Sequence, residues 1–97
     1  MIEKMTAKIR KHIIFSGRVQ GVGFRWHSKS FANSVGLTGW VQNLEDGTVE
    51  MEVQETEEKI DRLIEYLESR NYVMIERMDC RTIPLESSEW EFHERGW

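Results

Sequence analysis

The 97-residue sequence contains a single cysteine, Cys80, and a single proline. One cysteine cannot form an internal disulfide, which excludes the disulfide-stapled class of small secreted domains. No apolar run approaches the roughly 20 residues that a membrane-spanning helix needs. The first twelve residues also lack the apolar stretch of a secretory signal. These absences predict a cytoplasmic protein without a membrane-embedded part.

Clustered metal ligands and reactive nucleophiles are also missing. His12, His27 and His93 are scattered, and no Asp-x-Asp motif accompanies them, so we expect no bound metal. A cysteine phosphatase would need an arginine six residues after its cysteine, whereas Cys80 is followed there by Glu86. A hydrolytic reaction on this chain would therefore use a water molecule that the protein positions.

Charge is unevenly distributed along the chain. The composition is 39% apolar and 31% charged, which is typical of a soluble globular domain. Residues 1–48 carry seven Lys/Arg and three Asp/Glu, and residues 49–97 carry six Lys/Arg and fourteen Asp/Glu. The basic half favours a small anionic ligand, and the acidic half argues against a nucleic-acid partner.

Hydrophobic periodicity predicts an alternating order of strands and helices. Apolar alternation predicts strands, and apolar stripes at helical spacing predict one helix over Phe24–Val35 and another after Thr56. The pair Asp46-Gly47 predicts a tight hairpin turn, because such turns require positive φ. The strands are expected at residues 8–16, 37–43, 48–54 and 72–83, with a short additional strand at 88–93.

The resulting βαββαβ order is that of an α+β, ferredoxin-like α/β sandwich, in which two helices cover one face of an antiparallel sheet. With 97 residues, we expect a single domain over 1–97, with residues 1–6 as a flexible tail. Cys80, Met51, Met74 and Met78 are expected to be buried by packing.

The stretch GRVQGVGFR, residues 17–25, places three glycines between a predicted strand and a predicted helix. Glycines at positive φ turn successive main-chain N–H groups into one concavity beside the positive end of the helix dipole. Arg25 adds a guanidinium that can bind two phosphate oxygens at once. The alternative is a tight strand-to-helix connection with a solvated Arg25.

Asn43 ends the third predicted element on the same side as Val41. If Val41 faces the core, the Asn43 amide lies at the core rim, where it can orient a water by donating and accepting hydrogen bonds. The alternative is an asparagine that favours the following turn. The residues by themselves leave both interpretations open.

Three segments closely resemble the acylphosphatase family: Gly17 to Arg25, Gly36 to Asn43 and Asp46 to Glu50. The resemblance implies a ferredoxin-like fold and a cofactor-free hydrolase that converts small acyl phosphates to a carboxylate and inorganic phosphate. It implies that Arg25 and the loop main chain bind the phosphoryl group and that Asn43 holds the attacking water. The implied loop residues are Gln20, Gly21, Val22, Gly23 and Phe24.

Two other functions are considered for the same fold. A non-catalytic or regulatory module that binds acyl or carbamoyl phosphate would have no need to keep Arg25 and Asn43. An RNA-binding module would need exposed aromatics and basic side chains on the central strands, where Glu50 and Glu52 stand. We therefore expect an enzyme that acts as a monomer on a small molecule. Trp26, Trp90 and Trp97 are expected to pack rather than to line an acyl-group surface.

Overall fold

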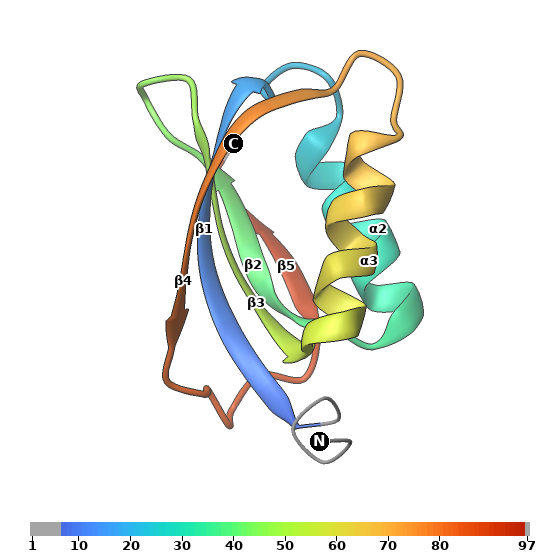
Figure 1. The fold of residues 1–97 in the computed structure, drawn as a ribbon, viewed down its shortest axis with the longest axis vertical. Coiled ribbons are helices and arrows are strands. Elements are labelled where there is room, and N and C mark those ends of the chain that lie inside the picture. The colour runs from blue at the N-terminus through green and yellow to red at the C-terminus, as the bar shows by residue number, and fades with distance from the viewer. Residues whose placement is uncertain (1–6, 97) are drawn as a thin grey trace.

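The computed structural model describes residues 7–96, so the predicted tail at 1–6 and Trp97 lie outside the described residues. One five-stranded sheet, with strand order β4-β1-β3-β2-β5, carries both helices on one face (Figure 1). The elements, in chain order, are β1 (Lys8–Arg18), α2 (Phe24–Val35), β2 (Thr38–Asn43), β3 (Val49–Thr56), α3 (Glu57–Glu68), β4 (Met74–Ile83) and β5 (Phe92–Arg95).

Local signals determine where the two helices begin and end. Helix α2 ends before Gly36, which has φ 83°, a left-handed conformation that glycine adopts without a steric penalty. Helix α3 begins after Thr56, whose hydroxyl accepts a hydrogen bond from the Lys59 main-chain N–H at 3.3 Å. Neither helix in the described residues 7–96 has the length and hydropathy to cross a bilayer.

The core lies between the sheet and the helices. Val41 pairs with Met51, and Met51 pairs with Ile13 on its other side, so three adjacent strands present buried side chains in one row. Phe24, Ile60 and other apolar residues of the two helices pack against these side chains and complete the core. The predicted ferredoxin-like arrangement is confirmed.

The fifth strand is present, with two differences from the prediction. It spans Phe92–Arg95 rather than 88–93, and it runs parallel to β2, so the sheet is mixed rather than wholly antiparallel. The chain leaves β4 at one edge of the sheet, and the segment 84–91 crosses to the opposite edge, as Figure 1 shows. It therefore arrives beside β2 running in the same direction as that strand.

Strand β4 corrects the expectation that Met74, Met78 and Cys80 are buried. All three side chains are exposed. The reason is that β4 lies at the edge of the sheet, so its apolar side chains have fewer neighbours than the same pattern has in a central strand.

Arg10 fastens the crossing segment to the polar face of the sheet. Its side chain is 3% exposed and donates to both Glu89 carboxylate oxygens, at 2.7 and 3.0 Å, and to Glu52 at 2.9 Å. Burial alone would lower the pKa of Arg10, but the hydrogen bonds and charges of Glu89 and Glu52 raise it above its ordinary value. The segment that leads into β5 is therefore tied to the central strands.

Candidate active site

The loop between β1 and α2 has the shape that its glycines predict. Gly21 has φ 74° and Gly23 has φ 79°, both in the left-handed region. Gly23 precedes α2 without a side-chain cap, and the first turn of that helix has no acidic residue. The positive end of α2 is therefore not neutralised by its own first turn, and an anion near it would be stabilised.

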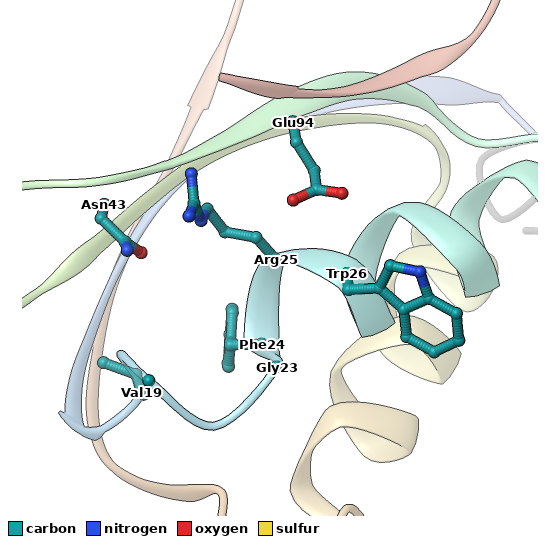
Figure 2. A pocket seen from close by; sticks show the side chains of 8 residues that line it. Val19, Gly23, Phe24, Arg25, Trp26, Asn43 and Glu94 are labelled. Carbon is teal, nitrogen blue, oxygen red and sulfur yellow. The ribbon is translucent and has the colours of Figure 1, made fainter. Parts of the chain in front are cut away.

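A cavity of about 190 Å³ opens beside this loop, and Figure 2 shows the side chains around it. It brings together the loop, the first turn of α2, the end of β2 and the end of β5. The lining residues are Val19, Gly21, Gly23, Phe24, Arg25, Trp26, Asn43 and Glu94.

Arg25 and Asn43, which lie far apart in the sequence, line the same cavity. In Figure 2 the Arg25 guanidinium extends towards Asn43 from the start of α2. The Arg25 side chain is half-buried, and its Nη1 donates to the Arg95 main-chain oxygen at 2.8 Å. Strand β5 thus contributes to holding the guanidinium in place.

Asn43 reaches the cavity through the alternation of β2. Val41 is fully buried in the core, and Asn43, two residues later, lies on the same face at the end of the strand. The conditional expectation, that Asn43 stands at the core rim if Val41 faces inward, is confirmed. The following turn also forms as predicted, with Gly47 at φ 93°.

Two of the expected loop residues, Gln20 and Val22, do not line the cavity. Val22 is partly buried and packs against the hydrophobic core. The Gln20 side chain donates to the main-chain oxygens of Leu44 and Thr48, each at 2.8 Å. Gln20 therefore ties the glycine loop to the β2–β3 hairpin, next to Asn43, which is a role that sequence reasoning missed.

Trp26 and Glu94 line the cavity without having been predicted there. Trp26 is 60% exposed, which corrects the expectation that it packs in the interior, and Trp90 is likewise exposed. Glu94 lies two residues after the buried Phe92, and strand alternation therefore places both side chains on the same face of the sheet. This pattern predicts a place at the cavity only if β5 is known to lie beside β2. Within residues 7–96, no group of three His, Cys, Asp or Glu side chains is arranged to hold a metal ion.

Comparison with known proteins identifies the family. The acylphosphatase family profile matches residues 11–93. An acylphosphatase of Picrophilus torridus is 52% identical over 66 residues, which cover 68% of this chain and 79% of that protein. An acylphosphatase of Geobacillus kaustophilus is 42% identical over 84 residues, which cover 86% of this chain and 89% of that protein.

Solved structures with a similar fold point to the same family. The structure of an acylphosphatase from Coxiella burnetii superposes with a TM-score of 0.80 at 32% identity, over 98% of this chain and 100% of that one. The sequence profile spans most of the chain, and the fold match spans nearly all of it. The chain belongs to the acylphosphatase family.

Proposed function

We propose that this protein hydrolyses the carboxyl–phosphate bond of small acyl phosphates, releasing a carboxylate and inorganic phosphate, and that residues 1–97 act as one monomeric domain. The observation that carries the proposal is the convergence of an uncapped helix start, the Arg25 guanidinium and the Asn43 amide on one cavity. No cofactor takes part in this reaction.

In this proposal the phosphoryl group lies against the loop of Gln20 to Phe24. Main-chain N–H groups of the loop and the Arg25 guanidinium bind its oxygens, where negative charge is concentrated in the transition state. Because the guanidinium also donates to the Arg95 main-chain oxygen at 2.8 Å, it is held in position before substrate arrives. Such preorganised donors stabilise developing charge at little reorganisation cost.

Asn43 holds the attacking water in line with the bond that breaks. The water oxygen attacks phosphorus, the bond from phosphorus to the acyl oxygen breaks, and its electron pair leaves with the carboxylate. Asn43 cannot accept a proton at neutral pH, so the water proton passes to a phosphoryl oxygen of the substrate. A carboxylate is a good leaving group, and the reaction therefore needs no strong general acid.

Hydrolysis of acetyl phosphate in the presence of a chelator tests this function. We expect the protein to release inorganic phosphate catalytically, at the same rate with and without excess EDTA, because no step uses a metal. Binding of acetyl phosphate without release of phosphate would contradict catalysis and favour the non-catalytic binding module. Loss of activity in EDTA would contradict the metal-free mechanism.

Gln20→Leu is expected to lower kcat/KM for acetyl phosphate by about tenfold, since displacements near 1 Å at a reacting site have large rate effects. Leucine keeps the approximate size of glutamine but removes both hydrogen bonds, which join the loop to the hairpin beside Asn43. The free energy of unfolding is expected to fall by about 1–2 kcal/mol, because two main-chain oxygens lose a donor. Steady-state kinetics and denaturant unfolding measure the two effects.

Gln42→Leu is the matched control for this variant. Gln42 also donates one side-chain hydrogen bond, to Glu50 at 2.8 Å, but it does not line the cavity. We expect it to lose stability while keeping kcat/KM within about twofold, because the hydrogen bond that it removes lies outside the cavity. Equal kinetic losses in the two variants would show that Gln20 acts only through general stability.

A further inference from the structure

Glu94 places a carboxylate at a cavity that is otherwise suited to an anion. It lines the cavity together with Arg25, Asn43 and Trp26, and its side chain is exposed. Figure 2 shows its carboxylate directed over the first turn of α2, between the positions of Arg25 and Trp26. A negative charge there repels anionic groups that approach along this side.

The backbone on both sides of Glu94 is held by side chains of helix α2. Asn33 accepts from the Phe92 main-chain N–H at 2.9 Å and donates to the Phe92 oxygen at 3.2 Å. Arg25 donates to the Arg95 oxygen at 2.8 Å. Because residues 92 and 95 are both tied to the helix that starts at the cavity, the position of Glu94 relative to that cavity is fixed.

The parallel pairing of β2 and β5 explains why Glu94 and Asn43 face the same cavity. Glu94 is paired with Val41 in the register of the two strands. Each strand runs from a buried apolar residue, Val41 or Phe92, to a polar residue two positions later. Alternation therefore brings Asn43 and Glu94 to the same face, at the end of the sheet where the cavity opens.

The two polar side chains lie on different sides of the Arg25 guanidinium. Figure 2 shows Asn43 on one side and Glu94 with Trp26 on the other. In phosphoryl transfer the attacking and leaving oxygens lie roughly in line across phosphorus. If Asn43 holds the water, the acyl group must leave on the side of Glu94 and Trp26.

We propose that Glu94 is a specificity-determining residue that faces the acyl group of the substrate and selects against acyl groups carrying a negative charge. This inference rests on the proposed roles of Arg25 and Asn43. The preferred substrates are acyl phosphates whose acyl group is neutral or positively charged. The phosphoryl group itself is bound further in by Arg25 and the loop, so the charge of Glu94 acts mainly on the acyl side.

Three benzoyl phosphates that differ at the para position test this proposal: unsubstituted, 4-carboxy and 4-aminomethyl. The measured quantity is the ratio of kcat/KM values between substrates at low ionic strength. The differences in chemical reactivity between the three substrates cancel when these ratios are compared between the original protein and its variants. We expect Glu94→Gln to lower the preference for the neutral over the anionic substrate by about tenfold, the scale of one partly screened charge at close range. Glu94→Lys should lower it further and reverse the preference for the cationic substrate.

Glu91→Gln is the matched control, because it removes one carboxylate charge just before β5, close to Glu94 in the sequence, and Glu91 does not line the cavity. It should keep the substrate ratios of the original protein. Unchanged ratios in Glu94→Gln, with benzoyl phosphate still hydrolysed, would overturn the role of Glu94 alone. Failure of the unaltered protein to hydrolyse benzoyl phosphate would overturn the proposed function and this inference with it.

Discussion

Arg25→Ala is expected to lower kcat/KM for acetyl phosphate by roughly 10³-fold or more, the largest effect of any single substitution in this protein. The guanidinium is permanently charged and extends into the cavity from the start of α2 towards Asn43. In the proposed mechanism it acts on the phosphoryl group both in the bound substrate and in the transition state. We therefore expect weaker competitive inhibition by inorganic phosphate as well as slower turnover.

Two further variants separate charge, geometry and stability at position 25. Arg25→Lys keeps the positive charge but loses the planar two-pronged donor, so most of the activity should still be lost. Arg62→Ala removes an arginine from the exposed face of α3, where it pairs with Glu58 at 3.2 Å, and should leave kinetics unchanged. Arg25→Ala loses the hydrogen bond to the Arg95 oxygen, at an expected cost of about 1 kcal/mol. Near-normal turnover by folded Arg25→Ala would refute the role of this residue.

Features that depend on neighbours in the sequence could be predicted closely. Helix α2 spans Phe24–Val35 as predicted, because an apolar stripe precedes a glycine that ends the helix in a left-handed conformation. The turn at Asp46-Gly47 is also determined by local contacts, because Thr48 donates its main-chain N–H to the Asp46 carboxylate at 3.0 Å. In both cases the signal and the structure it determines lie within a few residues.

Features that depend on a strand's place in the sheet could not be predicted. Met78 and Cys80 carry the residue types of a buried strand, yet they are exposed because β4 is an edge strand. The prediction that the last strand begins at residue 88 is wrong, because it rests on reading Trp90 and Phe92 as one alternating strand. Only Phe92 is buried, where β2 and the Asn33 side chain hold the backbone of the strand.

In the site, too, some features follow from neighbours in the sequence and others from contacts between distant segments. That Arg25 and Asn43 lie close together could be predicted from the glycine loop and the alternation of β2, supported by the family resemblance, and both line one cavity. Their catalytic roles stay a prediction. The side-chain role of Gln20 and the approach of Glu94 require knowing that the loop touches the hairpin and that β5 pairs with β2. Those are contacts between segments more than 20 residues apart, and no local pattern encodes them.

Asn43→Ala is expected to lower kcat for acetyl phosphate by roughly 10²-fold while changing inhibition by inorganic phosphate less than twofold. The reason is that, in the proposed mechanism, the amide acts on the water rather than on the phosphoryl group. The protein should remain folded, since Asn43 lies at the end of β2 and Val41 supplies the buried contacts. Asn71→Ala, a change of the same size at an exposed turn, should match the original protein.

Asn43→Asp distinguishes water positioning from a general effect of losing the amide. Aspartate has nearly the same shape as asparagine, but its charge repels the phosphoryl group, so phosphate inhibition should weaken together with turnover. Alanine should instead affect turnover almost alone. If Asn43→Ala weakened phosphate binding as much as it slowed turnover, the amide would belong to the phosphate site. The in-line arrangement would then fail, because the water would have no side chain to hold it opposite the leaving carboxylate.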